Sequence, residues 1–228
     1  MTKNIKFAVQ GNPLMGIPEP AKKHIPEWYR DAERFVGGKL KITTGVGNHG
    51  LKTCVPFLDA MTSGYTALLP IDILVEQTDL GPKLQWRSSP DPLEKRPRIN
   101  KTLPTPAGHD DDHYAWKSLF NIQVPKGYSI LITHPFNRFD LPFTTLSGVV
   151  DADMTMARGN LPFFLKSGFE GIIPVGTPIY QIFPFKRENW KSENDDSITK
   201  IAIENEFDSM RRVYGWYKNF KWNRKSYE

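Results

Sequence analysis

The feature that most constrains the fold is a series of short apolar segments over residues 125–187, punctuated by proline and glycine. Each segment spans only a few residues before a turn-forming residue interrupts it, a pattern typical of strands bounded by tight turns. The series therefore predicts an all-β body. We expect its strands at residues 120–124, 128–133, 144–150, 161–165, 171–174 and 179–185.

Composition supports this prediction. The chain has 228 residues, enough for one large β domain with appendages. Its 19 prolines, about 8% of the chain against a usual ~5%, favour short strands over long helices. We expect one domain, a distorted barrel or sandwich. Its parts are an N-terminal arm (1–49), a β core (50–187) with a proline-rich excursion (80–112), and a C-terminal amphipathic helix (205–228).

Further elements are expected outside the main series. Residues 5–9 and 84–87 are candidate strands, and residues 64–75 have the β-branched and aromatic content of a strand. A short helix is expected at 26–35, with a proline in its first turn. Residues 55–61 form an apolar segment that we expect to be buried.

The net charge is +5, with much of the excess at the C-terminus. The last eighteen positions contain one acidic residue, Glu228, and six basic residues: Arg211, Arg212, Lys218, Lys221, Arg224 and Lys225. Such a terminus is either a nucleic-acid contact surface or, more commonly, a solvated helix face. Asn205 is the expected N-cap of this helix. Its aromatic residues, Trp216, Tyr217, Phe220 and Trp222, are of the type that anchors interfaces.

A single cysteine, Cys54, excludes an internal disulfide and a cysteine zinc cluster. Because it adjoins the apolar segment at 55–61, a core thiol is expected. The N-terminus lacks the apolar centre of a signal peptide, and no apolar run approaches the length of a membrane span. We therefore expect an intracellular protein without a membrane partner.

Asp151 and Asp153 follow an apolar segment and Gly148, where a buried strand would meet the rim of the body. A carboxylate there could act as a general base on water or bind a ligand hydroxyl. The alternative is an aspartate that stabilises the following turn through backbone N–H groups.

A second polar group is His134, Asn137 and Arg138. Histidine with an arginine fork could bind an anionic ligand. Alternatively, Arg138 pairs with Asp140 or Asp153, and Asn137 simply turns the chain.

A third group lies at residues 109–113, where His109, Asp111 and His113 alternate with two further aspartates. A His-x-Asp pair with a later histidine is typical of non-haem iron sites, and two histidines with carboxylates can bind zinc. His134 is the later histidine. The same residues also suit an ordinary polar loop, because prolines precede them.

Five segments, at 54–61, 69–72, 134–138, 147–151 and 176–185, resemble a family of phage and bacterial proteins whose function is not established. The resemblance covers roughly residues 50–187. It implies kinship and a phage source, with a location in the host cytoplasm or in the virion.

Gly148-Val-Val-Asp151-Ala-Asp153, followed by Gly176-Thr-Pro-Ile-Tyr-Gln181, is more distantly similar to motifs of the dUTPase and dCTP deaminase superfamily. This resemblance implies a β-clip-like fold and gives Asp151 the position of the carboxylate that orients water in dUTPases. The chain departs from the pattern at His134-Pro-Phe-Asn137, where dUTPases carry Pro-Arg-Ser-Gly, and the glycine-rich phosphate motif is missing.

Three functions follow as hypotheses. The first is a structural or interaction protein whose C-terminal helix docks on a sister subunit, a virion protein or a host protein. The second is a nucleotide-binding protein or dUTPase-like hydrolase with Asp151 aligning water and His134 and Arg138 contacting the anionic ligand. The third is a metal-dependent enzyme with a divalent cofactor held by His109, Asp111, His113 or His134.

Overall fold

The computed structural model describes residues 3–9, 16–43, 46–87, 91–96, 104–118, 120–154, 159–211 and 215–228. By their internal contacts they divide into two compact units. Unit 1 comprises Met1–His24, Gly64–Arg187 and Tyr227–Glu228, and unit 2 comprises Ile25–Ser63 and Glu188–Ser226. The expectation of a single domain stays a prediction.

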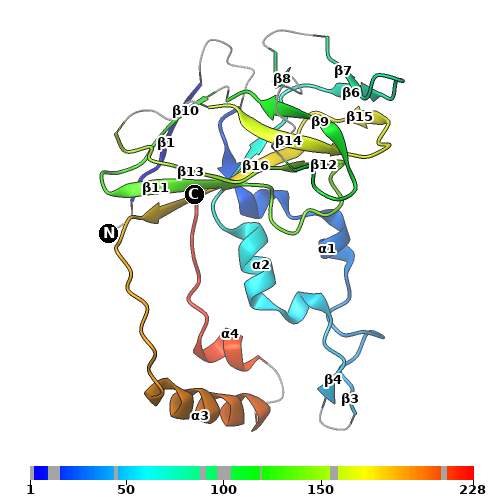
Figure 1. Cartoon of the computed structure of the whole chain (residues 1–228). Helices are drawn as coiled ribbons and strands as arrows, with labels where there is room; N and C mark the ends of the chain where they lie inside the picture. Colours follow the sequence, from blue (N-terminus) through cyan, green and yellow to red (C-terminus); the bar gives the residue numbers. More distant parts are fainter. Residues whose placement is uncertain are drawn as a thin grey trace. The chain divides into compact units, whose positions relative to one another are not determined.

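Unit 1 consists of antiparallel sheets, which confirms the mainly β fold class (Figure 1). Its largest sheet has the order β13 (Gly148–Val150), β11 (Tyr128–Thr133), β16 (Pro178–Lys186), β5 (Tyr65–Leu68) and β2 (Glu19–Pro20). A second sheet contains β12 (Phe143–Thr145), β14 (Leu161–Lys166), β9 (His109–Trp116) and β8 (Leu93–Lys95). The described sheets do not close into a barrel.

Two smaller sheets and a short helix complete unit 1. One sheet contains β15 (Gly171–Ile173), β6 (Ile73–Glu76) and β7 (Lys83–Gln85). The other pairs β1 (Lys6–Val9) with β10 (Phe120–Gln123). The 3-10 helix η1 spans Ala21–His24. Because β16 lies between β11 and β5, segments far apart in sequence share one sheet.

The position of β11 follows from its sequence. The chain turns just before it: Gly127 has φ 83°, and the Tyr128 N–H donates to the Pro125 carbonyl at 3.1 Å. This turn needs positive φ at its third residue, which glycine adopts without strain. Ile130 and Ile132, two residues apart, then point to the same side and are buried.

The centre of the core is aromatic. The rings of Trp116 and Phe163 stack with centroids 3.8 Å apart, and Phe143 meets the Trp116 ring edge-on at 5.0 Å. All three side chains are fully buried. The Trp116 indole N–H donates to the Thr145 hydroxyl at 3.0 Å, which satisfies the one polar group that burial would otherwise leave without a partner.

Several predicted strands needed correction. The expected strand at 144–150 is two strands, β12 and β13, and the expected strand at 64–75 is also two, β5 and β6. Residues 109–113 belong to β9 instead of a loop. Strand propensity disfavours acidic residues, but pairing with β14 and β8 prevails, and Asp112 is buried beside Lys95 at 3.0 Å.

Unit 2 contains the helices α1 (Glu27–Asp31), α2 (Val55–Thr62), α3 (Ser197–Arg211) and α4 (Trp216–Phe220) (Figure 1). It also contains the strands β3 (Ile42–Thr43) and β4 (Val46–Gly47) and the 3-10 helix η2 (Leu51–Thr53). The segment expected to be buried at 55–61 is thus helical, with only Met61 buried. No described helix has both the length and the apolar character that crossing a membrane requires.

The expected C-terminal helix is confirmed, but its bounds were wrong. α3 begins at Ser197, whose N–H donates to the Asp195 carboxylate at 2.9 Å, so Asn205 lies inside the helix and does not cap it. α4 is a separate helix after Gly215, which has φ 78°. The Asp195 carboxylate satisfies a backbone donor that an isolated helix would leave exposed, which explains the earlier start.

Candidate functional site

Both aspartates of the predicted acidic site bind one arginine at the end of β16. Arg187 donates to Asp153 at 2.9 Å and lies 3.2 Å from the Asp151 carboxylate. Asp153 also accepts the Gly127 N–H at 2.7 Å, and Asp151 accepts the Ser129 hydroxyl at 2.5 Å. The partner of Asp153 is therefore Arg187, and the alternative pairing with Arg138 was wrong.

These bonds fix the protonation of both carboxylates. Hydrogen bonds from Arg187 and from the Gly127 N–H lower the pKa of Asp153 to about 2. The Ser129 hydroxyl, followed by Arg187, lowers the pKa of Asp151. Asp153 has no exposed side-chain surface, so its role is to join strand ends, whereas Asp151 is 64% exposed. A water-orienting role for Asp151 stays a prediction.

His134 links two backbone segments through both ring nitrogens. Its Nε2 lies 3.1 Å from the Arg138 carbonyl, and its Nδ1 accepts the Thr145 N–H at 3.3 Å. A carbonyl partner requires a proton on Nε2, and an N–H partner requires a lone pair on Nδ1, so the ring is neutral. Burial lowers the pKa of His134, which agrees with this tautomer. The imidazole is used for structure.

Asn137 and Arg138 also have local partners. Asn137 has φ 61° in a turn closed by the Arg138 N–H and the Pro135 carbonyl at 3.2 Å. Arg138 binds Asp140 through two nitrogens, at 2.9 and 2.7 Å. These contacts match the turn-and-ion-pair interpretation of this segment.

The two predicted groups lie at opposite ends of one strand. Ser129, near the start of β11, binds Asp151, and His134 follows the last residue of β11. Five residues of strand separate them by roughly 17 Å. The structure therefore does not unite Asp151 with His134 and Arg138 in a single active site.

The predicted metal ligands on β9 have other partners. The ring nitrogens of His109 lie 3.0 Å from the Ala107 carbonyl and 2.8 Å from the Thr144 hydroxyl. Asp111 accepts the Thr105 hydroxyl at 3.0 Å, and His113 packs on Phe164. Among the described residues, no group of three or more His, Cys, Asp or Glu side chains could hold a metal ion.

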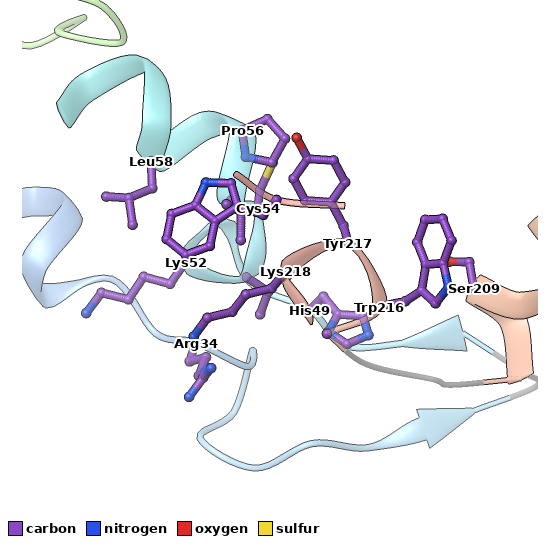
Figure 2. Close-up of a pocket in the computed structure, with 14 residues that line it drawn as sticks. Arg34, His49, Lys52, Cys54, Pro56, Leu58, Ser209, Trp216, Tyr217 and Lys218 are labelled. Carbon is purple, nitrogen blue, oxygen red and sulfur yellow. The ribbon is translucent and has the colours of Figure 1, made fainter. Parts of the chain in front are cut away.

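A pocket of about 520 Å³ lies in unit 2 (Figure 2). This volume is in the usual range for small-molecule sites. Its lining includes three cationic and three aromatic side chains, namely Arg34, Lys52 and Lys218 with Trp216, Tyr217 and Trp222. His49 and Cys54 also line it, and the described lining contains no acidic residue.

Backbone pairing positions the N-terminal wall of the pocket. Phe35 and His49 form a β-bridge, which brings Arg34 close to His49 in space. The Asn48 side chain reinforces this loop by accepting the Lys41 N–H at 2.6 Å. The Gly50 N–H donates to the Arg34 carbonyl at 2.9 Å. The surrounding backbone leaves no room for a β-carbon at this position, which requires glycine. The chain then enters η2 and α2, which present Lys52 and Cys54.

Cys54 is exposed at the N-terminus of α2, so the expectation of a core thiol was wrong. The physical reason is the helix itself. Residues 55–61 are helical and mostly half-buried, so a residue that precedes them in sequence need not enter the core.

A hydrogen bond across 163 positions holds the C-terminal wall. The Trp222 indole N–H donates to the Asp59 carboxylate of α2 at 2.8 Å, and Lys225 pairs with the same carboxylate. Asp59 is only 17% exposed, which strengthens these contacts relative to a surface pair. Gly215 starts α4, from which Trp216, Tyr217 and Lys218 enter the pocket.

Sequence reasoning missed this pocket as a site, although it noticed half of the lining. The aromatic and basic residues near the C-terminus predict a docking helix, a nucleic-acid contact surface or a solvated helix face, and none of these predictions includes a pocket. Arg34, His49 and Lys52 carry no motif, and only the fold brings them opposite α4. Comparison of the chain with protein-family models and with curated proteins gives no match.

Proposed function

We propose that the protein binds a nucleoside phosphate in the unit 2 pocket. The observation that carries this proposal is the convergence of three cationic and three aromatic side chains on one cavity. Cationic side chains bind phosphate oxygens by charge-assisted hydrogen bonds, and aromatic rings stack on bases. A ligand with both an anionic and an aromatic part uses the whole lining.

The arrangement of the side chains matches the two parts of such a ligand. Figure 2 shows the cationic ends of Arg34, Lys52 and Lys218 on one side of the pocket, with the Trp216 ring toward its far end. The Lys221 ammonium lies 5.3 Å from the centroid of the Trp216 ring, which fixes the ring by a cation–π contact. A phosphate would bind on the first side and a base would stack on the second.

Fluorescence anisotropy of a nucleotide carrying a fluorescent ribose substituent tests this proposal. Lys218→Gln should weaken binding by about 1.5–3 kcal/mol, the usual range for a hydrogen bond to a charged group. Lys83→Gln is the matched control, since Lys83 lines a separate pocket in unit 1 beside Trp86. Absence of nucleotide binding, or equal loss in both variants, would contradict the proposal.

A second candidate function is assembly with another copy of the chain through α3. This helix buries none of its side chains, and Ile203, Phe207 and Met210 are 48–65% exposed. These three residues lie on one side of the helix by their spacing. Lys200 and Arg211 nearly balance the three acidic residues of α3, so two copies could pair without strong repulsion.

Sedimentation velocity distinguishes this second candidate. Phe207→Lys should shift an oligomer toward the monomer, whereas the control Lys83→Gln, on β7 of unit 1, should leave the assembly state unchanged. An identical sedimentation profile for wild type and Phe207→Lys would exclude assembly through this face.

A further inference from the structure

We infer that the ligand of the unit 2 pocket is a single-stranded nucleic acid, an inference that rests on the nucleoside phosphate site proposed above. Residues 209–227 contain six lysines and arginines and no acidic residue. A free nucleotide needs only the cations that line one pocket. A nucleic-acid strand presents a phosphate at every nucleotide, so cations outside the pocket also contribute to its binding.

The aromatic surface also continues beyond the pocket. Trp216 and Tyr217 line the pocket, and Phe220 follows them on α4 without lining it. Phe220 is 55% exposed and Tyr217 is 43% exposed. On a helix, residues three and four positions apart are neighbours, so Phe220 lies next to both of these rings. Successive bases could therefore stack on successive rings.

Cations follow the same path as the rings. Lys218 lies on α4 and Lys221 follows the helix directly as its C-cap; both are exposed, as is Arg224 in the segment that follows. This interleaving of cations with rings is the combination that binds single strands without sequence preference. An acidic peptide would use the cations but not the rings. In a duplex the bases are already stacked on one another, so the rings could not reach them.

The hydrogen bond between Trp222 and Asp59 fixes the end of the aromatic and basic surface that adjoins the pocket. It ties the chain after α4 to α2, and α2 follows η2, which carries the pocket residue Lys52. The Trp222 ring, which lines the pocket, is therefore held in place before the ligand arrives, and this lowers the entropic cost of binding. We place the first nucleotide in the pocket and the next nucleotides along α4.

Anisotropy with fluorescein-labelled 12-mers of thymidine and of uridine, with unlabelled thymidine monophosphate as competitor, tests this inference on the full chain. We expect at least one 12-mer to bind about tenfold more tightly than the mononucleotide, with an affinity that falls as salt rises. The sugar of the tighter 12-mer identifies the natural strand as DNA or RNA. A duplex of the same length should bind more weakly.

Phe220→Ala separates this inference from the proposed function. It should weaken 12-mer binding about tenfold and leave mononucleotide binding unchanged, because Phe220 lies outside the pocket. Lys221→Gln is a second test, expected to reduce the salt dependence of 12-mer binding, and Lys83→Gln is the control expected to change neither. Circular dichroism verifies that each variant folds.

Equal affinities for 12-mer and mononucleotide would overturn the inference and leave the nucleotide site standing. The same holds for equal affinities of single strand and duplex, or for a Phe220→Ala variant with wild-type 12-mer binding. Absence of binding by every ligand would overturn both proposals.

Discussion

The polar residues that stand out in the sequence of unit 1 have structural partners, whereas several cationic residues of unit 2 line a cavity. In unit 1, Arg187 joins two aspartates, and His134 has a backbone partner at each nitrogen. In unit 2, Lys52, Lys218 and Trp216 line one pocket. A cluster of polar residues that resembles a motif can therefore have a structural role at strand ends. A binding surface can arise from residues that form no motif.

The largest effect should come from comparing one tryptophan in each unit. Trp116→Ala removes a fully buried ring and its bond to Thr145, so it should lower the free energy of unfolding by about 3–5 kcal/mol. Trp216→Ala removes a half-buried ring and its cation–π contact with Lys221, so it should lower the free energy of unfolding by only about 1 kcal/mol but weaken nucleotide binding. Urea unfolding and ligand anisotropy measure the two effects. Equal destabilisation by both variants would contradict the contrast between a structural tryptophan in unit 1 and a ligand-binding tryptophan in unit 2.

A smaller effect is expected at the carboxylate that holds the C-terminal wall of the pocket. Asp59→Ala removes the acceptor for Trp222 and the partner of Lys225 and should cost about 1.5–3 kcal/mol. Hydrogen exchange should show the loss of protection in residues 216–222. Asp59→Asn is the matched control, because its amide oxygen can still accept the indole N–H. If both variants retain full protection, this bond does not position the wall.

Much of unit 1 could be predicted from the sequence because its turns are marked. Tyr128–Thr133 matches its predicted strand at both ends, since Gly127 fixes its start and Pro135 limits its extent. Prediction failed where a short loop divides an apolar stretch, as between Thr145 and Gly148. It also failed at β9, whose acidic residues conceal a strand pattern that only the partner strand makes evident.

The candidate site was less predictable for a physical reason. Its lining comes from residues 34–58 and 209–222, so no local pattern contains both walls. Local chemistry indicated only the C-terminal half, through aromatic and basic residues in the same segment. The cations that oppose them come from a loop held by the Phe35–His49 bridge, and pairing of that kind depends on contacts distant in sequence.

A third test addresses the turn at Asn137. Asn137→Ala should cost about 1–2 kcal/mol, because a residue with a β-carbon is strained at φ 61° and alanine lacks the side-chain oxygen that helps asparagine tolerate it. Asn137→Gly should be close to wild type, since glycine adopts this conformation readily. Thermal unfolding measures both. A ligand-binding role for Asn137 would instead make both variants bind more weakly while leaving stability unchanged.

The smallest effect is a pH dependence that belongs to unit 1 alone. Burial lowers the pKa of His134 below its value of about 6.5 in the unfolded chain, so between these two values the unfolded chain binds more protons. The contribution to stability is therefore complete above about pH 6.5 and declines as the pH falls toward the folded pKa. Unfolding at pH 7.5 and 5.5 should show this decline in wild type and less of it in His134→Gln. NMR should show a neutral ring with its proton on Nε2. A folded pKa above 6.5 would mean that His134 has a charged partner, and the contrast between a structural unit 1 and a ligand-binding unit 2 would then need revision.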